Sequence, residues 1–397
     1  MLRARHRILV SLVAALAGAA HLDAQAAAAP TPLNFSGIIF GSYNFQQSTT
    51  PSPLNRQIDN AFIVDRAYLT FRMPAGEHTS IRITTDIYQT PDTTPNANAY
   101  AIRAKYAYLQ YDATKMDNGL QLTGRIGILQ NVVIDHQETF WPRYLSQVAV
   151  ERAGYFSSAD VGVATQVALP NKMGEFYGTI TNGPGYTSRE TDRFKDFAAR
   201  LSLTPLANTK DMPPLLSTFT ITAWGYKGAT ASGFVNGGPG TDGAIGSALD
   251  RSRAGLFVGI KDPRLVVAGE WARRHENGET GANTTASPRA LTETSGQLLS
   301  AYTVIRPLAF ASETGKSPFG VVARYDYVKP TLSTTGFATV PSTDNAYHTA
   351  IAGLFWDLSQ KAQLALDYQE SLASNNALSN APPAQSKAYF AHFVVNF

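Results

Sequence analysis

The feature that most constrains this 397-residue chain is an alternation of apolar and polar side chains with a period of two. In residues 79–89, Ile81 and Ile83 fall on one face, and Arg82 and Asp86 fall on the other. Successive side chains of a strand point to opposite faces, so this pattern predicts strands with one apolar and one wet face. The pattern recurs in 120–129 and 158–169.

The alternation leaves two classes of protein open, a large soluble β protein and a transmembrane β-barrel. After residue 26, no apolar run approaches the ~20 residues that a membrane-spanning helix needs. The chain is nevertheless rich in aromatic residues, with 18 Tyr and 20 Phe, and only 16% of its residues are charged. A chain of this kind can cross a membrane as a barrel, because closure of the sheet pairs every backbone group in lipid.

About sixteen strands are predicted, an even number, as in single-chain bacterial barrels. The fold class expected is therefore all-β, a transmembrane antiparallel up-and-down β-barrel. Besides the three segments above, strands are expected near 33–46, 61–73, 101–112, 174–182, 194–204, 215–227, 252–261, 264–275, 296–306, 319–329, 346–358, 361–371 and 387–397.

The connections between these strands alternate in length. Every second one is a short turn or a Pro-rich stretch, the latter near 205–214 and 307–318. The others are mostly longer and rich in Gly, Ser, Thr, Asn and Pro, as in 228–251 and 277–295. Outer-membrane barrels have short periplasmic turns and longer extracellular loops, so the alternation favours a barrel over a soluble sandwich or β-helix. The short turns are 74–78, 113–119, 170–173, 262–263 and 359–360.

The amino-terminal segment has the pattern of a secretory signal peptide. Basic residues precede a short apolar run at 8–20, and an Ala-rich stretch beyond it offers small-residue cleavage sites. We therefore expect a signal peptide at 1–26 and an outer-membrane β-barrel at 27–397, with the mature chain beginning close to Gln25 or Ala27. A membrane anchor or a disordered tail is the alternative. The absence of cysteine excludes a lipid-modified cysteine at the cleavage site.

The signal peptide also accounts for most of the positive charge. The formal net charge of the chain is +3, and Arg3, Arg5 and Arg7 less Asp23 supply +2 of it, which leaves about +1 for the mature chain. Nucleic-acid binding needs a concentrated basic face, so the charge gives no support to a nucleic-acid partner.

The chain ends in a strand of alternating aromatic residues. Tyr389, Phe393 and Phe397 share one face of it. This ending resembles the carboxy-terminal signature of outer-membrane barrels, which the barrel assembly machinery reads. We therefore expect Phe397 to be the assembly signal.

The third extracellular connection, near 130–157, is the longest. It carries Asp135, Glu138, Arg143 and Glu151, with apolar side chains between them. Such apolar content is unusual for a loop exposed to water. We expect the loop to fold inward and pack against the inner barrel wall. An extracellular cap with a small core of its own is the alternative.

Five basic side chains fall on the inner face of four successive strands. Facing the third loop, they are expected to form the pore constriction, with a transverse field that favours polar solutes and gives a weak anion preference. Each could instead make an ordinary ion pair or snorkel at the lipid interface. On one of these strands, Tyr106 and Tyr108 compete for the wet face. The five are Arg66, Arg82, Arg103, Lys105 and Arg125. Further inward candidates are Arg72, Arg200, Arg253, Arg324, Asp86, Asp196, Glu270, Asp326 and Asp367.

Several segments resemble bacterial porins of the phosphate-selective, O/P-type group. The resemblance covers mainly residues 35–205 and the terminal strand. It implies a sixteen-stranded barrel, usually trimeric, with inward Arg and Lys that guide anions. The nearly balanced mature charge and the mixed charge of the third loop depart from the anion-selective members, so phosphate selectivity is not carried over. The segments are AFIVDRAYLTFR (61–72), IRITTDIY (81–88), KYAYLQYD (105–112), ERAGYFSSADVGVA (151–164) and KDFAARLSLTP (195–205).

No catalytic, metal or cofactor motif stands out. The cluster of Asp135, His136 and Glu138 lacks a second His at metal-ligand spacing. The run GGPGTDG at 237–243 lacks the Lys of a phosphate loop. We expect a passive diffusion channel for small hydrophilic solutes rather than an enzyme. Its expected partners are outer-membrane lipid and lipopolysaccharide, the assembly machinery, and two further copies in a homotrimer. The alternative is an outer-membrane barrel enzyme or adhesin with a closed lumen.

Overall fold

The computed structural model describes residues 33–48, 60–90, 99–231, 248–280, 290–335, 345–373 and 385–397. The expected signal peptide at 1–26 and the glycine-rich run at 237–243 lie outside these residues. The chain divides into two units, Met1–Leu33 and Asn34–Phe397, and every strand described belongs to the second.

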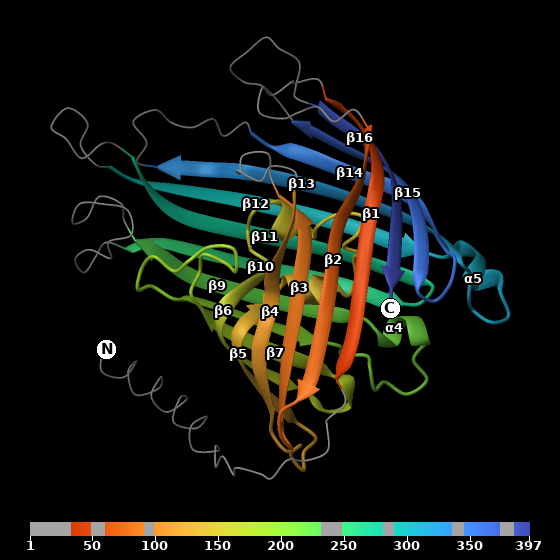
Figure 1. The fold of residues 1–397 in the computed structure, drawn as a ribbon, viewed down its shortest axis with the longest axis horizontal. Helices are drawn as coiled ribbons and strands as arrows, with labels where there is room; N and C mark the ends of the chain where they lie inside the picture. Colours follow the sequence, from red (N-terminus) through yellow and green to blue (C-terminus); the bar gives the residue numbers. More distant parts are fainter. Residues whose placement is uncertain are drawn as a thin grey trace. The chain divides into compact units, whose positions relative to one another are not determined.

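Within the described residues, sixteen strands form one closed antiparallel barrel, in which each strand pairs with its neighbours in the sequence and β1 pairs with β16 (Figure 1). The predicted fold class and strand number are confirmed. The strands are β1 (Asn34–Ser48), β2 (Asn60–Pro74), β3 (Thr79–Gln89), β4 (Tyr100–Asp112), β5 (Gln121–Gln130), β6 (Ala159–Ala168), β7 (Gly174–Thr181), β8 (Asp196–Leu203), β9 (Thr220–Ala231), β10 (Ala248–Asp262), β11 (Leu265–Thr280), β12 (Ala290–Ile305), β13 (Phe319–Thr335), β14 (Tyr347–Asp357), β15 (Ala362–Ala373) and β16 (Gln385–Asn396).

The short connections gather at one end of the barrel, here the turn end, and the long ones at the other, here the loop end. Short helices lie within some of these connections. None of the helices among the described residues is long and apolar enough to cross a membrane. The helices are α2 (Ile134–Gln137), α3 (Ala149–Arg152), α4 (Pro214–Ser217) and α5 (Pro307–Ala311), with a 3₁₀ turn, η1, at Pro170–Lys172.

Two kinds of strand boundary differ from the sequence prediction. The strand expected from residue 215 begins at Thr220, because Pro213 and Pro214 start the helix α4 instead. Towards the loop end, β10, β11, β12 and β13 run several residues beyond the predicted limits. These extensions are rich in Ser, Thr, Gly and charged residues, so they lack the apolar alternation on which the prediction rests.

The barrel wall is apolar outside and polar inside along much of its length. Ile83 and Leu366 are exposed on the outer face, whereas Thr84 and Asp367, their neighbours in the sequence, are buried on the inner side. The period-two alternation of the sequence therefore separates the two faces of the wall, as a barrel surrounded by lipid requires.

A β-bulge in β4 resolves the competition between its basic and aromatic residues. Thr85 pairs with Ala104 and Thr84 pairs with Tyr106, so Lys105 is an extra residue without a partner across the ladder. A bulge of one residue reverses the phase of the strand beyond it. Arg103 and Lys105 on one side of the bulge, and Tyr106 and Tyr108 on the other, therefore all face inward.

The two ends of the barrel chain meet at the turn end of the β1–β16 seam. The Gly37 amide donates to the Phe397 carbonyl at 2.9 Å, and the Phe397 amide donates to the Gly37 carbonyl at 3.0 Å. The ring of Phe397 lies 5.8 Å from the ring of Phe35. A Cβ atom on Gly37 would lie 2.3 Å from the Phe397 ring, so a larger residue here would displace that ring.

Candidate functional site

The connection 131–158 lies inside the barrel. Phe140 packs against Phe257 of β10, and Trp141 packs against Tyr302 of β12, with ring centres 4.9 and 5.1 Å apart. Trp141 is completely buried by the inner wall and the rest of the loop. These contacts confirm the prediction of an inward-folded third loop and exclude an extracellular cap.

Buried polar contacts fasten the loop to the inner wall at several heights. His136 Nε2 lies 3.0 Å from Thr222 Oγ1 of β9, and Gln137 Nε2 donates to Glu270 of β11. Arg324 of β13 donates to the carbonyl of Gln147 at 2.7 Å. Burial, with smaller contributions from Arg200 and Lys261, lowers the pKa of His136 to about 3, so its imidazole is neutral at neutral pH. The loop is therefore held against the wall of β9 to β13.

A second set of contacts continues around the barrel. Gln369 of β15 donates to the carbonyl of Leu145 at 2.8 Å. Tyr144 lies with its ring 5.9 Å from that of His392 on β16. The loop thus contacts the wall at several strands from β9 to β16, whereas β2 to β5 carry the predicted basic residues.

On β2 to β5, three cations have neutral partners. Arg82 Nε donates to Thr84 Oγ1 at 3.1 Å. Arg125 donates to the side-chain carbonyl oxygens of two glutamines, at 2.8 and 2.7 Å. Lys105 Nζ lies 4.1 Å from the centre of the Tyr68 ring. Within the part of the chain that the structure describes, none of the three makes an ion pair with a carboxylate. Arg82 and Arg125 are partly exposed, so their charge is available to the lumen, whereas Lys105 is buried.

Arg66 and Arg103 lie nearer the loop end of the same wall and share one carboxylate. Asp86 accepts from Arg103 at 2.8 Å and lies 3.6 Å from Arg66. Their side chains are about a quarter exposed. This group of three therefore carries one uncompensated positive charge.

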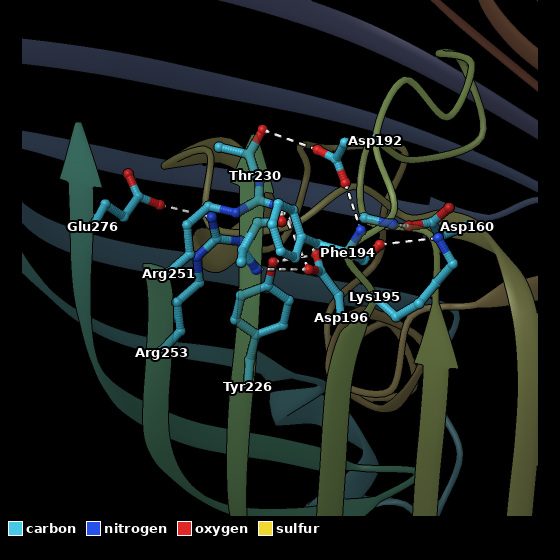
Figure 2. Close-up of polar contacts among 12 residues, drawn as sticks. Asp160, Asp192, Phe194, Lys195, Asp196, Tyr226, Thr230, Arg251, Arg253 and Glu276 are labelled. Carbon is cyan, nitrogen blue, oxygen red and sulfur yellow. Dashed lines mark hydrogen bonds and ion pairs between the residues drawn. The ribbon is translucent and has the colours of Figure 1, made fainter. Parts of the chain in front are cut away.

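The predicted inward arginines of the opposite wall are paired, whereas Arg274 of β11 donates to the carbonyl of Pro330. Arg200 lies 2.6 Å from Glu175, and Arg324 lies 2.7 Å from Asp326. Figure 2 shows the corresponding group near the loop end, where the Asp196 carboxylate meets Tyr226 and Arg251, and Arg253 meets Glu276. The inward candidates of this wall are thus neutralised by ion pairs, unlike the three cations opposite.

The charged residues of the loop largely compensate one another. Arg143 bonds both Glu138 and Glu151, the latter at 2.6 Å, so the three together carry one negative charge. Asp135 is exposed inside the barrel, and the cations that act on it most are Arg200, Arg82 and Arg125. The predicted loop residues therefore do lie within the lumen, but two of the acids are occupied by the arginine between them.

The turn end of the lumen opens into cavities beside the loop. One of about 550 Å³ is lined by Tyr68, Glu138 and Arg143, and by residues of the β14–β15 turn. Another of about 390 Å³ lies beside β6 to β9, lined by His136, Glu175 and others. Tyr68 of the barrel wall and Glu138 of the loop thus line the same cavity.

The sequence prediction missed most of the tyrosines of the site. Tyr68, Tyr88 and Tyr186 each lie within about 5.5 Å of a cation of the basic wall. Tyr186 comes from the connection 182–195, and its position there could not be inferred from strand phase. Among the described residues, no group of three His, Asp or Glu side chains could hold a metal ion.

Comparison with known proteins gives a likeness of fold. No protein-family model matches the chain, and no curated protein matches its sequence. A loop-deletion mutant of OmpT, an outer membrane protein of Vibrio cholerae, has a TM-score of 0.55 at 9% identity, over 92% of this chain and 100% of that chain. OmpF of Salmonella typhi, in complex with daunomycin, has a TM-score of 0.54 at 13% identity, over 92% and 98%.

A trimer form of the Vibrio cholerae OmpT, folded in vitro, has a TM-score of 0.52 at 9% identity, over 92% of this chain and 100% of that chain. At these identities the likeness concerns the barrel fold. It does not distinguish the phosphate-selective group from other outer-membrane barrels.

Proposed function

We propose that this protein is an outer-membrane porin, a passive diffusion channel for small hydrophilic solutes with a weak preference for anions. Its expected signal peptide at 1–26 and the outer-membrane origin of the similar structures support this location. The apolar outer face of the wall suits contact with lipid and lipopolysaccharide.

The observation that carries the proposal is the electrostatic difference between the two inner walls. On one wall Arg82 and Arg125 have neutral partners and are partly exposed to the lumen. On the other, Arg200, Arg253 and Arg324 are paired with carboxylates, and the loop contacts Arg324. A plugged structural barrel has no need for uncompensated cations beside its lumen, since isolated charges are costly to bury.

The constriction in this proposal lies between the basic wall and the third loop, where Asp135, Glu138, Arg143 and Glu151 face it. Because Arg143 compensates one of its two glutamates, the loop opposes the wall with only a small negative charge. The expected selectivity is therefore weak. Exposed charges beyond the constriction add little, since the Debye length is about 8 Å at physiological salt.

The decisive experiment is reconstitution in a planar bilayer. We expect stepwise conductance in KCl and a reversal potential, in a salt gradient, that favours chloride. Neutralising Arg82 and Arg125 together (Arg82→Gln with Arg125→Gln) should shift the reversal potential toward cations. Glu138→Gln removes the net negative charge of the group that Arg143 forms with Glu138 and Glu151, and should shift the reversal potential toward anions.

Two outcomes would contradict the proposal. Absence of conductance, where a control porin conducts, would favour the enzyme or adhesin with a closed lumen. Unchanged selectivity in both variants would mean that solutes pass elsewhere than along this wall.

We further propose that the porin is a homotrimer. The trimer form of the Vibrio cholerae OmpT supports this, as does the aromatic outer face near the β1–β16 seam, where Phe35, Tyr43 and Phe62 are exposed. Cross-linking in mild detergent should give a trimer band, and monomers alone would count against it.

A further inference from the structure

Each cation of the basic wall lies against the ring of a tyrosine. We define the basic column as Arg66, Arg82, Arg103, Lys105 and Arg125. Its members run from the loop end toward the turn end along β2 to β5. The distances to ring centres are 5.4 Å for Arg66–Tyr88, 4.7 Å for Arg82–Tyr106, 3.9 Å for Arg103–Tyr88, 4.1 Å for Lys105–Tyr68 and 5.6 Å for Arg125–Tyr108.

The upper part of the column is a partly exposed cation between two rings. The Arg103 guanidinium lies 3.9 Å from the centre of Tyr88 and 4.8 Å from the centre of Tyr186. Both rings are close to the guanidinium, and an incoming acceptor bonds its N–H groups. Asp86 occupies some of these N–H groups, and Arg66 beside it supplies a second set of donors. A solute anion therefore meets guanidinium edges framed by aromatic surface.

Lower in the column, the partners of the guanidinium groups can be replaced. Arg82 and Arg125 donate to hydroxyl and amide oxygens, which are uncharged. A carboxylate carries a charge opposite to that of the guanidinium and can accept two parallel hydrogen bonds from it, so it binds arginine more strongly than a neutral oxygen does. A passing carboxylate can therefore exchange with these oxygens while Tyr106 and Tyr108 stay beside it.

Arginines of the opposite wall also lie over rings. Arg324 lies 5.0 Å from the centre of Trp141 and is paired with Asp326, and the loop covers both. Arg274 lies 5.4 Å from the centre of Tyr155 and donates to a backbone carbonyl. The basic column differs in that several cations lie over tyrosine rings on adjacent strands of one wall.

We propose that the basic column favours aromatic carboxylates over other anions of the same charge. The inference rests on the proposed porin function and names the solute class for the same pathway. The carboxylate would move between guanidinium edges, and the aromatic ring of the solute would pack on the partly exposed rings of Tyr88 and Tyr186. A saturated carboxylate or inorganic phosphate would gain from the cations but not from the rings.

The test compares benzoate with cyclohexanecarboxylate, which has the same charge and a similar size but no aromatic ring. Reversal potentials across planar bilayers, with potassium salts of the two anions and of inorganic phosphate, give their relative permeabilities. We expect benzoate to be about two- to five-fold more permeant than cyclohexanecarboxylate, the range that corresponds to an exposed aromatic contact. Equal permeabilities, or phosphate as the most permeant anion, would overturn the inference.

Variants distinguish an effect of the tyrosine rings on permeability from an effect of the shape of the pore. Replacing both upper rings (Tyr88→Leu with Tyr186→Leu) should bring the ratio close to one, whereas Tyr88→Phe, which keeps a ring, should preserve it. The matched control is Tyr325→Leu on the outer face of β13, where the side chain is half exposed outside the lumen. A ratio that survives the double leucine variant contradicts the inference. A protein that conducts no KCl contradicts the porin proposal itself, which distinguishes the two failures.

Discussion

Arg324 is the residue on which the position of the third loop depends most. Its guanidinium and the carboxylate of Asp326 are almost completely buried. It also donates to the carbonyl of Gln147 and to Ser146 Oγ on the loop. One side chain thus links the wall of β13 to the loop, so a change here alters both stability and the width of the lumen.

We expect Arg324→Met to be strongly destabilising, by about 3–5 kcal/mol, because it leaves the Asp326 charge buried without a partner. The thermal midpoint of unfolding in detergent should fall, and the single-channel conductance should become larger or noisier. A double variant, Arg324→Met with Asp326→Leu, removes both charges and should recover most of the stability. If the single variant were as stable as the double, the buried pair would not hold the loop.

His136 makes the stability of the loop depend on pH. Its pKa is about 3 in the folded protein, because of burial, against about 6.5 for a free side chain. As pH falls, His136 is therefore protonated in the unfolded chain at a higher pH than in the folded protein. The stabilising contribution is complete above pH 6.5 and is lost as pH falls toward 3, at up to about 1.4 kcal/mol per pH unit.

The corresponding variant is His136→Gln, which keeps a polar group beside Thr222. We expect its thermal midpoint to fall less steeply than that of the unchanged protein between pH 6 and pH 4. Parallel slopes would show that His136 is protonated without cost in the folded state.

The sequence predicted which charged side chains point into the barrel, but it did not predict which residues they pair with. Arg82 and Arg125 could be assigned because their neighbours in the strand are aliphatic. The pairing of Arg143 with Glu138 and Glu151 depends on how an irregular loop folds, which has no period to read. The same limit applies to Tyr186.

At the scale of single elements, β4 depends on its bulge. One extra residue, Lys105, lets basic side chains before it and tyrosines after it share the inner face. A regular strand with this sequence would send either Arg103 or Tyr106 into lipid. The sequence pattern was ambiguous here because inward residues have odd numbers before the bulge and even numbers after it.

Deleting Lys105 should be tolerated, since it joins the two halves of β4 in phase as a regular strand. Deleting Ala107 should not be tolerated, since it turns Tyr108 outward and Leu109 into the lumen. The measurement is the folded fraction of each variant, from heat-dependent mobility in gel electrophoresis. Similar folded fractions for the two deletions would mean that the phase of β4 does not matter.

Strand prediction succeeded where the alternation was clean and failed where it was not. The strand at 79–89 was predicted with its observed limits. The loop-end halves of β10 to β13 were cut short, because their residues are polar on both faces and give no periodic signal.

For the whole molecule, closure depends on the seam between β1 and β16. The backbone of Phe397 makes both hydrogen bonds that tie the end of the chain to Gly37, and its ring packs on Phe35. The number and order of the strands followed from sequence, but this contact between the two ends did not, because it follows from closure and not from any local pattern.

Deleting Phe397 should lower the yield of folded barrel, both through loss of the seam contacts and through loss of the proposed assembly signal. Phe397→Trp, which keeps an aromatic ring and the backbone bonds, is the matched control and should assemble. A normal yield after the deletion would contradict both roles.

The β1–β16 seam also affects the rate at which the barrel folds. Gln46 bonds Ser386 across 340 residues of chain, so the last pairing in the barrel joins segments at opposite ends of the polypeptide. Contacts this distant in sequence form slowly, because the entropy of the intervening chain is lost before they contribute. Until β16 arrives, β1 and β15 present open edges that can pair with other chains. A chain with this topology therefore remains prone to aggregation until the barrel closes. During that time, its open strand edges must be kept from pairing with other chains.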